Sequence, residues 1–248
     1  PDVRFITEVS INLADDPVLI RQMTDAGFVS IFVGIETPDE NSLKECHKGQ
    51  NLNRDLGECV NLLQRSGLQV MGGFIVGFDT DSASIFRRQV DFIQKTGIVT
   101  AMVGLLQAPF GTRLYQRMEG EGRILNEMTG DNADGSTNIV PKMGIRELQA
   151  GYQRLIKGIY EPKFFYKRVK TFLSVYNPMQ APVKIHPEEI AAFFSSIWRL
   201  GIFGRERREY WKLVFWTLAR YPKKFALAIT FAIYGYHFRK VNESMFAA

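Results

Sequence analysis

Four stretches in the first half of the chain alternate between apolar and polar residues with the period of a β-strand, and each precedes a helical pattern. In the first stretch Val9 and Ile11 face one way, whereas Glu8 and Ser10 face the other. The strands are expected over 4–12, 29–36, 68–77 and 98–106. The helices are expected over 17–26, 53–66, 84–96 and 112–121, and a further helix is expected to start at Thr37-Pro38.

Strands that alternate with helices at this spacing lie parallel, because each helix must return the chain in the same direction. Two architectures fit, an open doubly wound sheet and part of a barrel. A row of polar residues at Glu8, Ser10, Asn12 and Glu36 favours the barrel, whose inward face is polar near the ligand-binding strand ends. We therefore predict an α/β fold, a partial TIM-like (β/α) barrel.

The last 107 residues contain helical patterns without strands, so an all-α domain is expected to follow the barrel. Turn-forming residues gather in 123–143, which places the boundary between domains 1–141 and 142–248. The expected helices cover 144–160, 163–176, 187–200 with a cap at His186, 205–220 and 222–240.

The two regions differ in charge and aromatic content. Residues 1–141 carry 12 Lys or Arg and 19 Asp or Glu, a net charge of −7, whereas residues 142–248 carry 19 and 7, a net charge of +12. The second region also has 22 of the 31 aromatic residues. Such an asymmetry indicates different surroundings for the two regions. No nucleic-acid-reading motif accompanies the basic charge, so no nucleic acid partner is expected.

Cysteine and histidine usage predicts neither disulfides nor a metal site. Cys46 and Cys59 suit free thiols in a reducing compartment, and their separation fits no metal motif. His47, His186 and His237 are scattered along the chain. Since the chain also starts without a secretory signal pattern, we expect a cytoplasmic protein.

Two features offer candidate chemistry with a structural alternative for each. The glycine run 72–79 allows close approach of a flat ligand or a phosphate, or else serves packing. Glu36 ends an apolar strand, so its carboxylate must be solvated at the barrel mouth or paired, with Lys48 as the candidate cation.

The helix expected over 222–240 is nearly continuous in apolar and aromatic residues between Phe225 and Phe238, with basic residues on both sides. The apolar stretch is shorter than the ~20 residues of a membrane span. It fits peripheral contact at a bilayer surface, or burial against Trp198, Trp211 and Trp216.

Three motifs in order resemble strands four to six of the radical S-adenosylmethionine (SAM) barrel, in the branch with an N-terminal cobalamin-binding domain. They are Val33–Pro38, Gly73–Asp79 and Leu106–Thr112. Gly151-Tyr152 and Ile233–Phe238 resemble the helical C-terminal domain of a subset that includes hopanoid methylases. The resemblance covers nearly the whole chain.

The resemblance implies a 4Fe-4S cluster that cleaves SAM to a radical, cobalamin that delivers a methyl group, and an electron donor such as ferredoxin or flavodoxin. The substrate would be a small molecule or lipid with an unreactive carbon. The implied SAM contacts begin with Glu36 and Lys48, which would hold the methionine amino and carboxylate groups. The others are Ser10 and Glu8 near the ribose or methionine, and Gly73, Ile75, Gly77, Leu106 and Gln107 around the adenine.

One departure from the family pattern is serious, because the chain has no Cys-x3-Cys-x2-Cys motif for the cluster. In the family this motif follows strand one, whereas the first strand of this chain corresponds to strand three. We therefore expect the cluster and cobalamin ligands upstream of Pro1 and expect this piece alone to be inactive. The alternatives are a non-catalytic, barrel-derived binding module and an unrelated barrel enzyme.

Overall fold

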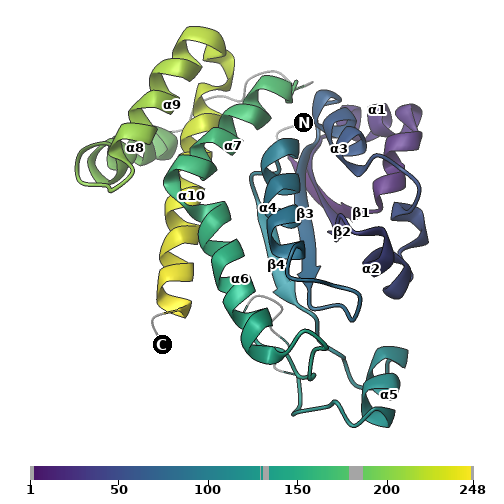
Figure 1. The fold of residues 1–248 in the computed structure, drawn as a ribbon. Helices are drawn as coiled ribbons and strands as arrows, with labels where there is room; N and C mark the ends of the chain where they lie inside the picture. The colour runs from purple at the N-terminus through teal and green to yellow at the C-terminus, as the bar shows by residue number, and fades with distance from the viewer. Residues whose placement is uncertain (1–2, 129, 131–133, 179–186, 247–248) are drawn as a thin grey trace.

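A computed structural model describes residues 3–128, 130, 134–178 and 187–246 (Figure 1). Four parallel strands form one sheet in the order β1-β2-β3-β4. Their bounds are β1 (Phe5–Val9), β2 (Phe28–Glu36), β3 (Gln69–Val76) and β4 (Ala101–Leu105). A doubly wound sheet reverses its strand order at a switch point. The sequential order of the described strands is that of a barrel segment, as predicted.

Helices connect the strands and form the second half of the chain. In the first half lie η1 (Ile11–Asp15), α1 (Pro17–Ala26), α2 (Glu40–Glu45), η2 (Gly49–Asn51), α3 (Leu56–Arg65), α4 (Ile85–Thr96) and α5 (Arg113–Gly120). In the second lie α6 (Ile145–Tyr160), α7 (Pro162–Val175), α8 (Pro187–Ser196), the π-helix η3 (Ile197–Ile202), α9 (Arg207–Arg220), η4 (Pro222–Lys224) and α10 (Phe225–Met245). The predicted cap at His186 lies outside the described residues.

Local capping explains where the predicted boundaries hold and where they move. Helix α1 begins as predicted, because the Asp16 carboxylate accepts a hydrogen bond from the Leu19 amide, and it ends at Gly27 with φ of 105°. Helix α2 starts later than predicted, at Glu40, because the Asp39 carboxylate caps it. Helix α3 likewise starts after its cap, Asp55, rather than at residue 53.

The first strand is shorter than predicted. It ends at Val9, and the chain turns into η1, where Ile11 and Leu13 are both buried. Ser10 and Asn12 therefore do not continue the face of β1, and the predicted polar row on one strand is wrong beyond Glu8. Local hydrophobic burial in a tight turn overrode the period of two.

The two faces of the sheet differ in their covering. Ile31, Val33 and Ile35 of β2 are fully buried on the face toward the helices, whereas Phe32, Gly34 and Glu36 on the opposite face are partly exposed. On that opposite face the side chains of Ile6 and Met102 are 64% and 48% exposed. A sheet face of this kind fits the interior of a barrel rather than a sheet buried on both sides.

Helix α6 covers the outer edge of the sheet at β4. The Tyr152 hydroxyl donates to the Val103 carbonyl at 3.0 Å, and the Tyr160 hydroxyl donates to the Ala101 carbonyl at 2.8 Å. Gly151 allows close packing on α4, since a Cβ there would lie 2.1 Å from the Phe86 ring. A single cluster of buried side chains thus continues across residue 141, and the predicted domain division stays a prediction.

Helix α10 packs into the helical region, which agrees with burial, one of the two alternatives predicted from the sequence. Ala228, Ile229, Phe231 and Ala232 are buried, and Gly235 lies against the Phe165 ring. Trp198 is not part of this packing, because it is 61% exposed. None of the helices that the structure describes combines the length and the hydrophobicity of a membrane span.

Arg168 of α7 is fully buried and joins three elements. Its guanidinium donates to the Ile159 carbonyl at 2.8 Å, the Gln94 side chain at 2.9 Å and the Val99 carbonyl at 3.3 Å. It also lies over the Phe165 ring, 5.1 Å from the centroid. This guanidinium therefore fixes the end of α6 and the start of β4 relative to α4.

Replacing Arg168 by alanine should lower the free energy of unfolding by about 3 kcal/mol, because it leaves a cavity and removes donors from buried carbonyls. The measurement is urea unfolding followed by circular dichroism. Arg154→Ala is the matched control, since Arg154 is exposed on α6. Equal unfolding free energies for the two variants would contradict the assigned role.

Candidate functional site

The carboxyl end of β2 is irregular at Glu36. The pairing with β3 shifts between Gly34 and Glu36, which marks a bulge. Glu36 has a φ of 64°, and the Thr37 amide donates back to the Ile35 carbonyl at 2.8 Å. A non-glycine residue pays a conformational penalty in this left-handed region, and such strain is concentrated at functional sites.

Two buried amide side chains hold this strained turn. The Asn51 Nδ2 group donates to the carbonyls of Gly34 and Ile35 at 3.1 and 3.0 Å, and Gln89 Nε2 donates to the Ile75 carbonyl at 2.7 Å. Gln89 Nε2 also lies 3.4 Å from the Glu36 carbonyl, so it joins the end of β2 to β3. These amides take the place of ladder hydrogen bonds that the bulge interrupts. The sequence analysis missed both residues. Gln89 has one sequence signal, because it falls on the apolar face of the helix predicted over 84–96, together with Ile85 and Ile93. Asn51 has none.

Glu36 and Lys48 form the ion pair that the sequence analysis offered as one alternative. Lys48 Nζ lies 2.8 Å from Glu36 Oε1, with side-chain exposures of 33% and 15%. Gly34 provides the space, because a Cβ there would lie 2.6 Å from Glu36 Oε1 and 3.0 Å from Lys48 Nζ. A carboxylate and an ammonium group are thus held together at the rim of the open face.

The glycines at the start of the run in β3 serve packing. A Cβ on Gly73 would lie 2.9 Å from the Phe32 ring, which crosses β3 at that point. A Cβ on Gly72 would lie 2.7 Å from the Phe74 ring on the other face. Ile75 is partly buried, opposite Gly104. Gly72 and Gly73 therefore make room for these two rings, and a ligand contact at Gly73 stays a prediction.

Gly77 serves the turn that follows β3. Its φ is 108°, and its amide donates to Asp81 Oδ2 at 2.8 Å. The same carboxylate accepts from the Phe78 amide and the Ser42 hydroxyl, and burial raises the pKa of Asp81. Glu45 accepts hydrogen bonds from the amides of Asp79 and Thr80. Two carboxylates of this kind give the turn a fixed shape.

The end of β4 is covered by the segment 136–138. Leu106 and Gln107 are 6% and 9% exposed. The Thr137 hydroxyl donates to the Leu106 carbonyl at 2.6 Å, and the Asn138 side chain both accepts from and donates to Ala108 at 2.8 Å. These two predicted site residues therefore lie beneath a loop, and the sequence analysis missed Asn138.

The remaining predicted site residues lie on the first strand or after it. Glu8 is exposed in β1 and pairs with Phe32, so both belong to the open face. Ser10 is exposed at the start of η1, beyond the end of β1, rather than on the strand itself as predicted. The structure brings Glu36 and Lys48 together directly, whereas Glu8 and Ser10 make no contact with that pair among the described interactions.

The described residues contain no group of three or more His, Cys, Asp or Glu arranged to hold a metal ion. Cys46 and Cys59 are both free thiols. Burial raises the pKa of the Cys46 thiol, which disfavours the thiolate form that binds metals.

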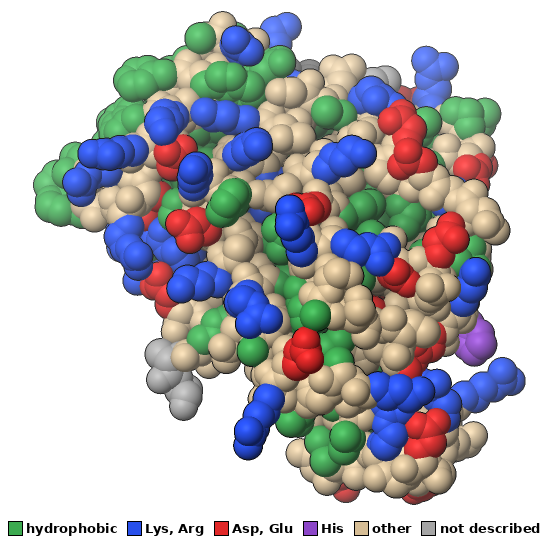
Figure 2. All heavy atoms as spheres, in the orientation of Figure 1, with side chains coloured by type: hydrophobic (Ala, Val, Ile, Leu, Met, Phe, Trp, Pro, Cys, Tyr) green, Lys and Arg blue, Asp and Glu red, His purple; other side chains and the backbone are tan. Residues whose placement is uncertain are grey.

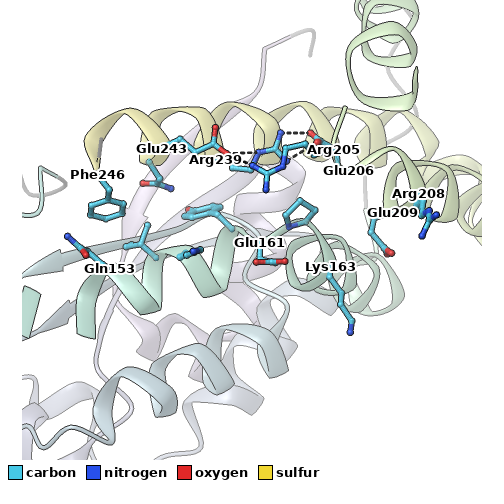
Figure 3. A pocket seen from close by; sticks show the side chains of 15 residues that line it. Gln153, Glu161, Lys163, Arg205, Glu206, Arg208, Glu209, Arg239, Glu243 and Phe246 are labelled. Carbon is cyan, nitrogen blue, oxygen red and sulfur yellow. Dashed lines mark hydrogen bonds and ion pairs between the residues drawn. The ribbon is translucent and has the colours of Figure 1, made fainter. Parts of the chain in front are cut away.

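A cavity of ≈ 560 Å³ lies away from the sheet, among α6, α7, α9 and α10 (Figure 3). Five basic and four acidic side chains line it, and Glu206 and Arg239 pair with each other through two hydrogen bonds of 2.8 Å. Its charges largely balance one another, so the rim of the sheet remains the candidate site.

Comparison with known proteins places the second half of the chain in a defined family. A profile described as "Domain of unknown function (DUF4070)" matches residues 112–248, more than half of the chain. The chain belongs to the DUF4070 family. In this DUF4070 chain the match begins at the cap of α5 and includes all of α6 to α10.

Relatives of the DUF4070 chain are named as methyltransferases. An uncharacterized methyltransferase of Synechocystis sp. is 33% identical over 97% of this chain and 46% of its own length. The hopanoid C-2 methylase of Rhodopseudomonas palustris is 29% identical over 88% of this chain and 42% of its own length. The bacteriochlorophyllide d C-8(2)-methyltransferase of Chlorobaculum tepidum is 23% identical over 71% of this chain and 36% of its own length. The predicted resemblance is confirmed, and the chain spans less than half the length of these relatives.

An ion pair beneath the rim provides a test of the loop that follows β3. Arg123 donates to both oxygens of Asp79, at 2.9 and 2.6 Å, and this hydrogen bonding lowers the Asp79 pKa below 3.8. Arg123→Gln should therefore cost about 1–3 kcal/mol of unfolding free energy at neutral pH. Arg123 stabilises only the ionised form of the Asp79 carboxyl group. The loss of unfolding free energy should therefore shrink as pH falls below 3.8 and this group becomes protonated.

Unfolding free energies measured by urea titration across this pH range check the expectation. Arg87→Gln is the control, because Arg87 pairs with Asp91 on the surface and should cost at most about 0.5 kcal/mol. A loss for Arg123→Gln that is independent of pH would contradict the assignment to Asp79 ionisation.

The backbone strain at Glu36 predicts an unusual stability order. Glu36→Gly should be more stable than Glu36→Ala by about 1 kcal/mol, because glycine adopts a φ of 64° without a steric penalty. The same comparison at Glu8, in regular strand, should have the opposite sign. Thermal unfolding of the four variants measures both differences, and a less stable Glu36→Gly would show that the turn is unstrained.

Proposed function

We propose that this chain is part of a cobalamin-dependent radical SAM methyltransferase that acts on an unreactive carbon of a lipid or other apolar substrate. The relatives named methyltransferases support the reaction class, and the relative named hopanoid C-2 methylase supports an acceptor of lipid character. The observation that carries the proposal is the paired carboxylate and ammonium of Glu36 and Lys48 at the rim of the open sheet face.

The charge pattern of this pair fits the methionine end of SAM. A free amino acid group carries one ammonium and one carboxylate, so its recognition requires one acceptor and one cation. Glu36 would accept hydrogen bonds from the ammonium and Lys48 would hold the carboxylate. Gly34 keeps the space beside them open, and the Asn51 amide holds the backbone that presents Glu36.

The other predicted contacts differ in where they would lie relative to SAM. Gly73 and Ile75, on the open face, would border the adenine, with Phe32 crossing the same surface. Gly77, Leu106 and Gln107 are buried and would support the adenine side from beneath. Glu8 and Ser10 are exposed and would lie on the ribose or methionine side.

The proposal assigns no cluster ligand to this chain. The described residues do not provide a ligand set for a 4Fe-4S cluster. When bound, the cluster and cobalamin would supply reductive cleavage of SAM and delivery of the methyl group, with electrons from a donor such as ferredoxin or flavodoxin. The part of the described residues is to bind and orient SAM.

SAM binding, measured by equilibrium dialysis with labelled SAM, tests the assignment. Glu36→Gln and Lys48→Met should each weaken binding by about tenfold or more, because each leaves one charge of the amino acid group unpaired. Gly34→Ala should also weaken binding, since its Cβ displaces the flexible ends of both side chains.

Two neighbouring variants serve as controls. Glu40→Gln removes an exposed carboxylate of α2, and Gly49→Ala adds a Cβ where no atom lies within 4 Å. Both should bind SAM like the unchanged chain. Equal affinity of all the variants would sink the assignment, and SAM binding by an intact protein that transfers no methyl group would favour a binding module instead.

A further inference from the structure

Seven large apolar side chains are exposed together on α8, η3 and α9, which project away from the sheet (Figure 1). This apolar tip comprises Ile190, Phe194, Trp198, Ile202, Phe203, Phe215 and Leu218, each between 45% and 67% exposed. Figure 2 shows hydrophobic side chains gathered along the outer edge over these helices. Single exposed apolar residues are ordinary, whereas a contiguous patch marks a binding surface.

Ring contacts connect the members of the apolar tip. Ile190, Phe194 and Trp198 follow one another at intervals of four residues, and the Trp198 ring lies 4.9 Å from that of Phe203. Trp211 extends the row onto α9: it donates to the Gly201 carbonyl at 2.9 Å, and its ring stacks on Phe215 at 5.6 Å. These two ring pairs and the hydrogen bond to Gly201 thus connect η3 with α9 along the tip.

A buried frame holds the apolar tip in place. The hydroxyls of Ser196 and Tyr210 lie 2.8 Å apart and join the end of α8 to α9. Leu200 and Gly201 of the π-helix are buried, whereas Trp198 and Ile202 of the same helix are exposed. The Glu206 carboxylate accepts two hydrogen bonds from Arg239 of α10 and anchors the start of α9. The exposure of the rings is thus built into the fold.

Basic residues surround the apolar tip. The elements of the tip and η4, residues 187–224, have eight Lys or Arg and four Asp or Glu. Glu206 is paired with Arg239 and Glu209 with Lys212, whereas Glu188 and Glu189 lie in the first turn of α8. Within the described residues five exposed cations of this segment make no ion pair: Arg199, Arg207, Arg208, Arg220 and Lys223. Their charge is available to an external anionic partner.

We propose that the apolar tip docks this protein onto an anionic lipid bilayer. Aromatic and aliphatic side chains enter the boundary between headgroups and acyl chains, while long basic side chains remain at the phosphates. The excess of unpaired cations around the apolar tip complements anionic headgroups, and adjacent apolar and basic residues such as Trp198 and Arg199 suit the boundary of a bilayer. The surface lies on α8 to α9, not on α10, and does not depend on the methyltransferase proposal.

Co-sedimentation with vesicles tests this proposal on the full chain. Vesicles of equal parts phosphatidylcholine and phosphatidylglycerol should bind the chain, and vesicles of phosphatidylcholine alone should bind it weakly. The double variant Trp198→Ser with Phe203→Ser should bind about tenfold more weakly, because it removes two inserted rings. Arg207→Gln with Arg208→Gln should weaken binding most at low salt, where charges are least screened.

Matched controls lie elsewhere on the surface. Val18→Ser removes an exposed apolar side chain from α1, and Arg146→Gln removes an exposed cation from α6, so both should bind vesicles like the unchanged chain. Unchanged circular dichroism would establish that the tip variants fold. Binding that survives the Trp198 and Phe203 double variant would overturn the proposal. The proposal would also be overturned if the unchanged chain did not bind vesicles but formed a dimer that the double variant abolished. A second copy of the chain would then cover the tip.

Discussion

Backbone carbonyls at the rim and the outer edge of the sheet accept hydrogen bonds from side chains instead of neighbouring strands. At the bulge of β2 the donors are Asn51, to Gly34 and Ile35, and Gln89, to Glu36, and at the edge of β4 they are Tyr152 and Tyr160. Arg168 does the same for the carbonyl of Val99 just before β4. A buried carbonyl without a donor costs about as much as a lost hydrogen bond, so these side chains decide where the strands can end.

The candidate site follows from this constraint. Because Asn51 holds the carbonyls of Gly34 and Ile35, the chain can turn at Glu36 with a φ of 64°. That turn directs the Glu36 carboxylate to Lys48 rather than along the strand. Stability and function are therefore coupled at this point, since the interactions that support the strained turn also present the charged pair.

The inner surface and the outer end of the helical region differ in what they contact. Its inner surface packs on α4 and completes the core through α6 and α7. Its outer end exposes aromatic rings on a frame held by Ser196, Tyr210 and the pair of Glu206 with Arg239. One set of helices thus supports the barrel segment and presents a surface of its own.

Much of the architecture was predictable because it depends on local patterns. Alternation and helix caps predicted the four strands and the helices between them, and Asp16 and Gly27 bound α1 as expected. The strand predicted over 4–12 was too long, since periodicity alone does not reveal that Ile11 and Leu13 bury together in a turn. Asn51, Gln89 and Asn138 escaped notice because an amide in a helix or loop has no distinctive sequence pattern.

By itself the sequence determined the order of the elements, the charge difference between the two regions, and the family resemblance in three motifs. These properties depend on residues close together in the chain. Only the tertiary structure decided that Gly72 and Gly73 accommodate rings, that Leu106 and Gln107 lie beneath a loop, and that the apolar tip lies on α8, η3 and α9 rather than on α10. Burial and partner choice depend on residues that are distant in sequence, so a one-dimensional pattern does not encode them directly.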